Sequence, residues 1–132
     1  MAGTYLKPGF AISRIVNPVL MTFRIVPTLA VRGRRTGEWR TVPVNVLDLD
    51  GARYLVAPRG DTNWARNLRA AGAGEIRTRR GTEPFTAVEV PEEERKPIID
   101  AYLARWGSQV ESQFAKLPDP ADHPVFRLWQ SS

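Results

Sequence analysis

The chain contains no cysteine and only one histidine, His123. The absence of cysteine excludes disulfide bonds and thiolate metal sites, and it is typical of a protein in a reducing compartment such as the cytoplasm. One histidine is too few for a histidine-rich zinc site. The familiar catalytic sets are also missing, since no G-x-S-x-G, Walker loop or G-x-G-x-x-G occurs. No catalytic residue is assigned from the sequence, so an enzymatic reaction would depend on a bound cofactor.

No apolar run is long enough to cross a membrane. The most apolar segment, residues 15–31, is interrupted by Pro18, Arg24 and Pro27, whereas a spanning helix needs about 20 consecutive apolar residues. Residues 10–25 nevertheless carry a helical apolar stripe with arginines outside it, which predicts an amphipathic N-terminal helix. Two roles stay open for this helix: it covers one end of the core, or it makes peripheral contact with the inner face of the membrane.

Negative charge is scarce in the first two thirds of the chain. The 132 residues carry a net charge of +5, and residues 1–90 hold 14 Lys and Arg against 7 Asp and Glu. This excess favours an anionic partner, such as nucleic acid, a phosphorylated cofactor or lipid headgroups, over a merely well-solvated surface. Nucleic acid is disfavoured, because Trp39 is the only aromatic residue that lies amid the arginines.

Alternating apolar residues predict a mainly β protein with inserted helices. Strands are expected at residues 28–32, 40–49, 54–57, 76–80, 84–90 and 123–129. Helical segments are expected at residues 62–72 and about 91–116, with breaks in the second at Pro97 and Gly107. The result is one α+β, mainly β domain over residues 1–132, a small barrel of about six strands with helices packed outside. A five-stranded oligonucleotide-binding barrel also matches this strand count.

Three stretches have the composition of a ligand site. Residues 33–37, GRRTG, place two guanidinium groups on a tight turn, and arginine forks bind phosphate or carboxylate at two points. Residues 58–61, PRGD, join a strand to a helix, where free amides and the helix dipole favour an anion. On that helix, Trp64, Asn67 and Leu68 share one face. For each stretch an ordinary structural role is the alternative.

The motifs RGRRTGEWRTVPV, YLVAPRG and TNWARNLRA follow one another in residues 28–90, and HPVFRL follows near the end. Together they resemble the signature of the deazaflavin (F420)-dependent nitroreductase family. The resemblance implies a split β-barrel related to FMN-binding proteins, with coenzyme F420 as the cofactor. It also implies hydride transfer from the reduced deazaflavin to a small-molecule acceptor such as a quinone, an enone or a nitro compound.

The resemblance also implies the residues that bind the cofactor: Arg34, Arg35, Thr36, Gly37, Pro43, Val44, Ala57, Pro58, Arg59, Gly60, Trp64, Asn67 and Leu68. The arginine turn would hold the phosphate or the tail carboxylates, Pro43 and Val44 would line the ring, and the loop 57–60 would wrap the ring edge and ribityl chain. One departure is Pro58, which stands where many members have a polar residue.

Several points stay open at the level of the sequence. FMN is an alternative to F420, although its single phosphate needs fewer arginines. A non-catalytic protein that binds a lipid or fatty acid in the same barrel is the alternative function. The oligomeric state is open, and so is which of the C-terminal aromatics Tyr102, Trp106, Phe114 and Phe126 face the pocket. Their helical spacing favours core packing.

Overall fold

A single antiparallel sheet dominates the computed structural model, which describes residues 26–131. In this range the strands are β1 (Thr28–Arg32), β2 (Trp39–Pro43), β3 (Leu47–Leu49), β4 (Ala52–Val56), β5 (Ala73–Thr78), β6 (Gly81–Glu89) and β7 (Val125–Gln130). They pair in the order β2-β1-β5-β6-β7-β4-β3. The predicted N-terminal helix at residues 10–25 lies outside the described residues. No helix of the described part is long and apolar enough to cross a membrane.

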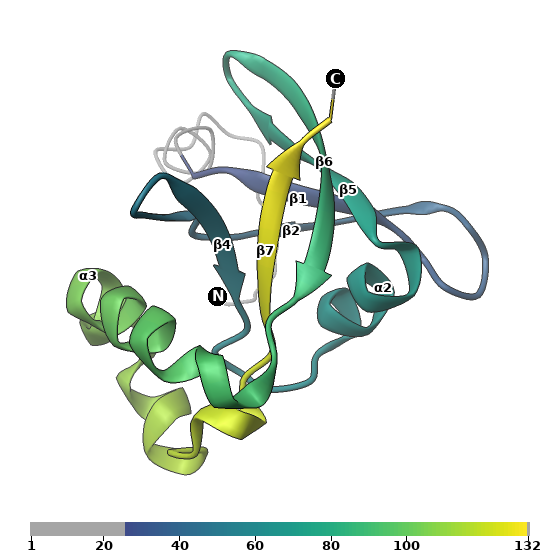
Figure 1. Ribbon diagram of the computed structural model, residues 1–132. Coiled ribbons are helices and arrows are strands. Elements are labelled where there is room, and N and C mark those ends of the chain that lie inside the picture. The colour runs from purple at the N-terminus through teal and green to yellow at the C-terminus, as the bar shows by residue number, and fades with distance from the viewer. Residues whose placement is uncertain (1–25, 132) are drawn as a thin grey trace, which may run out of the picture.

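The helices lie outside the sheet, as predicted (Figure 1). Helix α2 (Asn63–Ala71) packs against β1, β5 and β6, and α3 (Arg95–Lys116) packs against β3 and β4. Two short 3-10 turns, η1 (Glu92–Glu94) and η2 (Pro120–Asp122), flank α3. Helix α2 begins after Thr62 and ends at Gly72, which confirms the boundaries predicted for it.

The continuous strand predicted at residues 40–49 is wrong. The alternation there is interrupted after Pro43, and the two pieces, β2 and β3, lie at opposite edges of the sheet. Proline has no N–H to continue a ladder, and the next amide, that of Val44, donates instead to Pro27 O at 3.0 Å. Only residues 44–46 join the two edges, a connection that spans at most about 14 Å. The sheet must therefore curl until its edges approach, which makes it an incomplete barrel.

The other predicted turns are confirmed. Asp50 and Gly51 both have positive φ, 52° and 81°, and they join β3 to β4. Two successive residues with positive φ are the requirement of a type I′ turn, whose twist matches that of the flanking strands. The hairpin predicted around Gly81 also forms, between β5 and β6.

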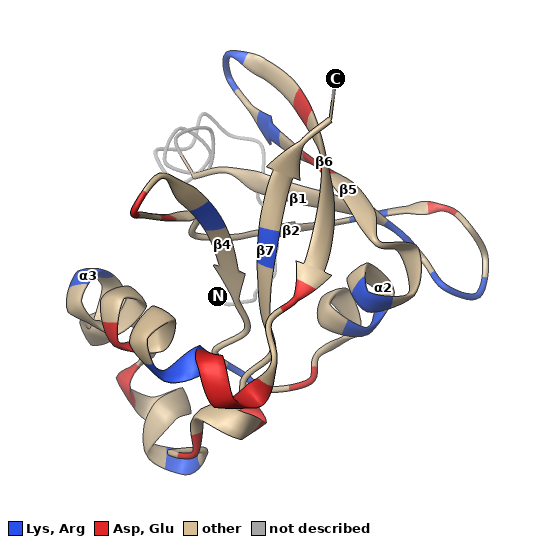
Figure 2. Ribbon diagram, in the orientation of Figure 1, with Lys and Arg blue, Asp and Glu red and all other residues tan. Residues whose placement is uncertain are grey.

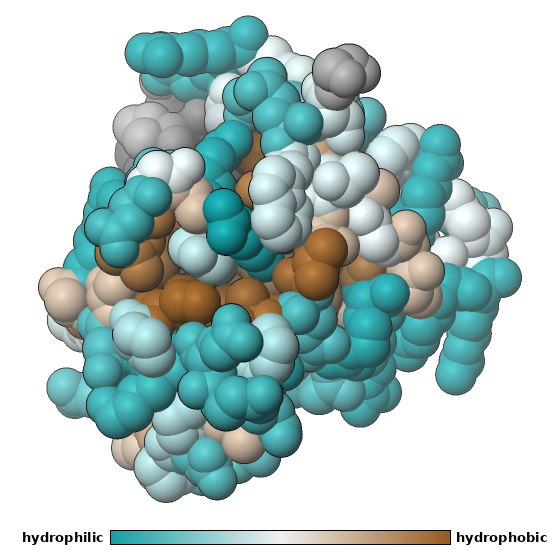
Figure 3. Space-filling model, in the orientation of Figure 1, coloured by the Kyte–Doolittle hydropathy of each residue, from teal (hydrophilic) through white to brown (hydrophobic). Residues whose placement is uncertain are grey.

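Two apolar clusters fill the two faces of the central strands. Successive side chains of a strand point to opposite faces, so Leu55 and Phe126 join one cluster with Leu68 of α2. Their neighbours Val56 and Val125 join a second cluster beneath α3. Figure 3 shows brown, apolar atoms where the sheet meets the helical segment below it, in a face that is otherwise largely hydrophilic. The strands β4 and β7 are thus fixed by packing on both sides.

Helix α3 lies within the predicted helical range, about residues 91–116, but it has no break at Pro97. Pro97 lies in its first turn, where a missing N–H leaves no intrahelical bond unmade, so the helix does not restart there. The break predicted at Gly107 lies one residue earlier, at Trp106, whose φ of −125° and ψ of 15° leave the helical region. This kink allows the second half of α3 to turn toward the open side of the sheet.

Candidate functional site

A cavity of about 1070 Å³ lies on the open side of the curled sheet. The β1–β2 connection, the segment after β2, the β4–α2 loop, the start of α2 and the second half of α3 form its walls. These walls comprise Val26, Gly33, Arg34, Arg35, Thr36, Arg40, Thr41, Val42, Pro43, Val44, Asn45, Val56, Pro58, Arg59, Thr62, Asn63, Trp64, Arg66, Asn67, Tyr102, Gln109, Val110 and Gln113. The three stretches singled out in the sequence therefore meet at one cavity.

The arginine turn at residues 33–37 is closed by its own backbone. Gly33 N donates to Glu38 O at 2.8 Å, and Gly37 N donates to Gly33 O at 2.9 Å. The turn is then fastened to α2, because Asn67 Oδ1 accepts from Arg34 twice: from the backbone N at 3.1 Å and from Nη1 at 2.7 Å. Asn67 is 6% exposed. Its side chain thus orients the turn that carries the two guanidinium groups.

Four of the cavity arginines have no carboxylate partner among residues 26–131. By contrast, ion pairs hold several arginines elsewhere in the fold, including Arg53, Arg69 and Arg77. The four unpaired cavity arginines are Arg34, Arg35, Arg40 and Arg59. Figure 2 shows blue segments and one red segment on the β1–β2 connection. Like charges gathered without counter-charges make this wall strongly attractive to an anion.

The start of α2 adds further anion donors to the same wall. Helix α2 has no acidic residue in its first turn, so no carboxylate within the helix offsets its positive dipole end. Thr62 stands at the N-cap position, as predicted, but its side chain makes no capping hydrogen bond. The Thr62 hydroxyl is buried and has no hydrogen-bond partner in the described structure. A buried hydroxyl normally has a hydrogen-bond partner, so the unpaired Thr62 Oγ1 indicates that a ligand in the cavity supplies one.

A second, neutral part of the cavity wall comes from α3 and from Asn45 in the segment after β2. Asn45 Nδ2 donates to Tyr102 Oη at 3.4 Å and to Gln109 Oε1 at 3.5 Å, and Gln113 lies along the same helix. Tyr102 is almost completely buried. Burial raises the pKa of its phenol, and the hydrogen bond from Asn45 offsets part of that rise. The phenol therefore stays protonated at neutral pH and remains a hydrogen-bond donor.

Nine of the thirteen predicted cofactor residues line the cavity: Arg34, Arg35, Thr36, Pro43, Val44, Pro58, Arg59, Trp64 and Asn67. The other four do not. Ala57 and Leu68 are fully buried in the first apolar cluster, and Gly37 belongs to the turn without reaching the wall. Gly60 faces a separate groove of about 470 Å³ on the other side of its loop.

Sequence reasoning left the α3 wall unassigned. Of the four C-terminal aromatics, only Tyr102 lines the cavity, whereas Trp106, Phe114 and Phe126 contribute to the apolar clusters. Asn45 and Gln109 were not singled out at all. The signal available in the sequence was weak: an amide in the short segment after Pro43, and a run of amides at helical spacing after Gly107.

Known structures show which fold this is. The chain is similar to the protein Atu2129 (unknown function) from Agrobacterium tumefaciens str. C58, with a TM-score of 0.62 and 18% identity over 96% of this chain and 60% of that one. The chain therefore spans about three fifths of the length of Atu2129. An F420-H2 dependent reductase, FDR-A, matches with a TM-score of 0.57 and 21% identity over 80% of this chain and 95% of that one.

HutZ, a heme storage protein from Vibrio cholerae, also matches, with a TM-score of 0.56 and 13% identity over 89% of this chain and 91% of that one. At such identities the likeness shows the fold alone, and it confirms the predicted split barrel. No curated protein matches the sequence. The family model described as F420H(2)-dependent quinone reductase matches residues 13–116. This match indicates coenzyme F420 as the cofactor, and the chain belongs to the F420H(2)-dependent quinone reductase family.

Proposed function

We propose that this protein holds reduced coenzyme F420 in the cavity and reduces a quinone by hydride transfer. The observation that carries the proposal is the division of the cavity into two unlike walls. One wall presents arginines without carboxylate partners in the described structure, and the other presents neutral hydrogen-bonding side chains. An anionic cofactor tail suits the first wall, and a neutral carbonyl compound suits the second.

The residues present fit each part of coenzyme F420. The phosphodiester and glutamate tail need several cationic donors, which Arg34, Arg35, Arg40 and Arg59 supply, and the orphaned Thr62 hydroxyl adds a neutral one. The flat ring needs an apolar wall, which Pro43, Val44 and Trp64 supply. The volume of about 1070 Å³ is slightly above the range of about 300–1,000 Å³ that is usual for ligand sites. Such a volume suits a cofactor together with a small acceptor.

The bound cofactor supplies the hydride, and the chain supplies orientation and polarity. The arginine wall would hold the anionic end of the cofactor, and Pro43, Val44 and Trp64 would hold its ring, which restricts the orientation of the cofactor in the cavity. Tyr102 Oη accepts from Asn45, which leaves the phenol proton for a quinone oxygen. When negative charge develops on that oxygen, a donor that is already in place stabilises it without reorganisation. Tyr102 is therefore the proposed donor to the acceptor.

Fluorescence titration of the purified protein with F420, and in parallel with FMN, tests the cofactor. We expect saturable binding of F420 that weakens with salt, and much weaker binding of FMN, whose single phosphate engages fewer arginines. If FMN binds more tightly than F420, FMN and not F420 is the cofactor of this site. If neither ligand binds but a fatty acid does, the protein is a lipid carrier and the reductase proposal is wrong.

The contribution of the arginine wall is tested with two variants of equal charge change. Arg34→Ala with Arg35→Ala removes cationic groups from the cavity, whereas Arg79→Ala with Arg80→Ala removes the same charge from the β5–β6 turn, outside the cavity. We expect the first pair to weaken F420 binding roughly 100-fold, the equivalent of about 3 kcal/mol for two charged contacts. The second pair should change it by less than about threefold. Equal weakening by both pairs would mean that only overall charge matters.

The acceptor is tested by following the oxidation of reduced F420 with a quinone, an enone and a nitro compound at equal concentrations. We expect the quinone to react fastest, because the Tyr102 phenol is placed to donate to the carbonyl oxygen on which negative charge develops. A nitro compound or enone that reacts faster would assign a different acceptor class to the same cofactor site.

A further inference from the structure

The loop between β4 and α2 carries Pro58 and Arg59 of the cavity wall, and several hydrogen bonds hold it in place. Within the loop, Gly60 N donates to Ala57 O at 3.2 Å, and Thr62 N donates to Gly60 O at 2.8 Å. Gly60 has a φ of 97°, which disfavours other residues, and a Cβ there would meet Leu117 Cδ1 at 3.1 Å. The loop therefore has one position that requires glycine, and at that position it packs closely against the segment that follows α3.

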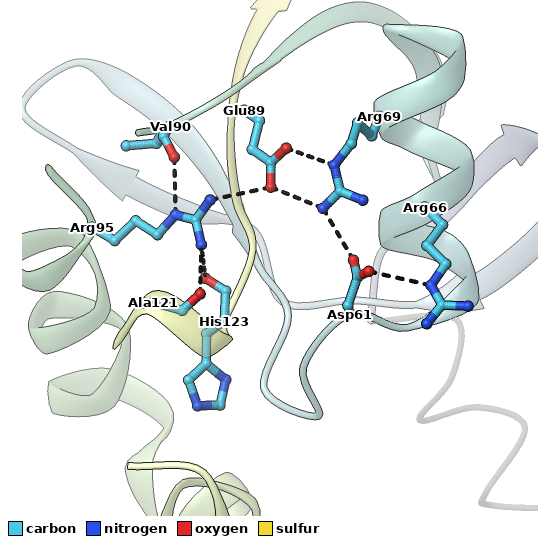
Figure 4. A network of polar contacts seen from close by, with 8 residues as sticks. All are labelled: Asp61, Arg66, Arg69, Glu89, Val90, Arg95, Ala121 and His123. Carbon is cyan, nitrogen blue, oxygen red and sulfur yellow. Dashed lines mark hydrogen bonds and ion pairs between the residues drawn. The ribbon is translucent and has the colours of Figure 1, made fainter. Parts of the chain in front are cut away.

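The carboxylate of Asp61 ties this loop to α2. Its Oδ2 accepts from Arg66 Nε at 3.2 Å, and its Oδ1 accepts from Arg69 Nη2 at 3.0 Å (Figure 4). Burial alone would raise the pKa of Asp61, but the hydrogen bonds from Arg69 and Arg66 outweigh it and lower the pKa. Asp61 is thus ionised at neutral pH and bridges two turns of the helix.

The hydrogen bonds of Arg69 continue to Glu89 at the end of β6 and from there to Arg95 at the start of α3. Arg69 donates to both oxygens of Glu89 at 2.6 and 2.9 Å, and Glu89 Oε2 also accepts from Arg95 at 3.2 Å. Arg95 is 7% exposed and donates to Val90 O at 2.9 Å. It donates as well to the carbonyls of Ala121 at 3.1 Å and His123 at 3.4 Å. A continuous polar chain therefore runs from the loop to the start of α3 and the segment before β7, as Figure 4 shows.

The first residue of the loop is fastened from the opposite side. The ring of His123 is fully buried, with Nδ1 2.9 Å from Ala57 O and Nε2 in contact with Leu117 O. Phe114 stacks on the same ring, with centroids 4.0 Å apart. Ala57 and Asp61, the two ends of the Arg59 turn, are therefore both tied to structure outside the cavity.

We propose that Asp61 is a positioning residue, which holds the loop, and with it the Arg59 guanidinium, in the geometry that binds an anion in the cavity. This inference rests on the proposed cofactor site. It predicts that loss of the Asp61 carboxylate weakens anion binding, whereas simple electrostatics predicts that the same loss strengthens it. A carboxylate near an anion site weakens binding by repulsion, and Asp61 also neutralises Arg66, which lines the cavity. If charge alone mattered, removing the Asp61 carboxylate would strengthen binding. If Asp61 positions the loop, its removal weakens binding.

Asp61→Asn separates the two effects, because it keeps the shape of the side chain and removes its charge. We expect F420 to bind roughly tenfold more weakly, in keeping with one misoriented charged contact. In the ligand-free variant we expect faster amide hydrogen exchange at residues 59–62, a readout that needs no cofactor. Asp61→Glu retains a carboxylate for the two arginines, so it should restore a large part of the affinity.

The matched control is Asp100→Asn, which also removes one carboxylate from a surface ion pair, that with Lys96 at 2.8 Å. It should change neither F420 affinity nor exchange in the loop. Unchanged or tighter binding in Asp61→Asn, with normal exchange at residues 59–62, would overturn the role of Asp61. Absence of F420 binding in the wild-type protein is a distinct result, which contradicts the proposed function itself.

Discussion

Replacing Asn67 by alanine should loosen the arginine turn and destabilise the protein. Asn67 Oδ1 accepts a backbone hydrogen bond from Arg34 at 3.1 Å and a guanidinium hydrogen bond at 2.7 Å. A neutral hydrogen bond contributes about 1 kcal/mol, and the exposed position of Arg34 holds the charged one to about the same value. The sum is about 2 kcal/mol. For a chain of this size that corresponds to a Tm about 8 °C lower.

Asn67→Asp is the companion variant, because its carboxylate accepts the same two hydrogen bonds. Its stability should stay within about 1 kcal/mol of the wild type, since the new charge lies against the Arg34 guanidinium. Its affinity for F420 should nevertheless fall at least tenfold, because the carboxylate neutralises a guanidinium that the ligand needs. Asn67→Ala should therefore also lose F420 affinity, because the turn that carries the guanidinium groups is no longer held, whereas Asn67→Asp should lose affinity without a loss of stability.

Thermal unfolding followed by circular dichroism and titration with F420 measure both quantities on the same samples. An unchanged Tm for Asn67→Ala would show that the bonds to Arg34 do not hold the turn in solution. Wild-type affinity for F420 in Asn67→Asp would show that the charge of Arg34 does not contribute to binding, and Arg34 would no longer count among the anion-binding arginines.

Substitutions at three further positions test other parts of the molecule. Trp64 is half-buried and lines the cavity, and its ring centroid lies 6.2 Å from that of Phe126. Trp64→Ala should lower the free energy of unfolding by about 2–3 kcal/mol and weaken F420 binding, whereas Trp64→Phe should mainly weaken binding. Thermal unfolding and titration with F420 measure the two effects. Tyr102→Phe should leave F420 affinity and the Tm nearly unchanged but slow quinone reduction by about 10- to 100-fold in single-turnover assays, because the donor to the acceptor oxygen is gone. The hydrogen bond from Arg69 lowers the pKa of Glu89, and the pKa of Asp61 is lowered too, so their stabilisation is present above about pH 4 and is lost as the pH falls further. Glu89→Gln should flatten the dependence of Tm on pH between about 3 and 5, and an unchanged slope would contradict this linkage.

Local chemistry made much of the fold predictable. Asp50-Gly51 specified a hairpin, Thr62 and Gly72 bounded a helix, and the alternation at residues 28–32 specified a strand, because each signal acts within a few residues. The prediction failed at residues 40–49, where the alternation of valines continues through Pro43 while the backbone pairing does not. Val42, Val44 and Val46 do pack against the first apolar cluster. Burial follows the pattern there, but strand pairing depends on which N–H groups are available.

The site was predictable on the side that its own segments build. The arginine turn and the PRGD loop carry their chemistry in consecutive residues, and both line the cavity. The α3 wall was not predictable, since its residues follow the PRGD loop by more than 40 positions and the direction of Gln109 and Gln113 depends on the kink at Trp106. Helical spacing also could not tell Asn67 from Leu68. The two are adjacent, and only the packing of α2 on the sheet decides that one faces the turn and the other faces the core.

The contrast between paired and unpaired arginines makes a last prediction, about salt. Arg34, Arg35, Arg40 and Arg59 gather on one cavity without carboxylate partners among the described residues, so their mutual repulsion destabilises the ligand-free fold. Raising the salt concentration from about 0.05 to about 0.5 M screens that repulsion. The Tm of the ligand-free protein should therefore rise, while the affinity for F420 falls, because the same screening weakens the attraction of the wall for an anion. In Arg34→Ala with Arg35→Ala both salt effects should shrink together, whereas Arg79→Ala with Arg80→Ala should retain both. If the Tm still rises with salt to the same extent after Arg34 and Arg35 are replaced, the repulsion arises elsewhere in the protein. The cavity arginines would then not destabilise the ligand-free fold, and the argument that they form an unneutralised anion site would fail.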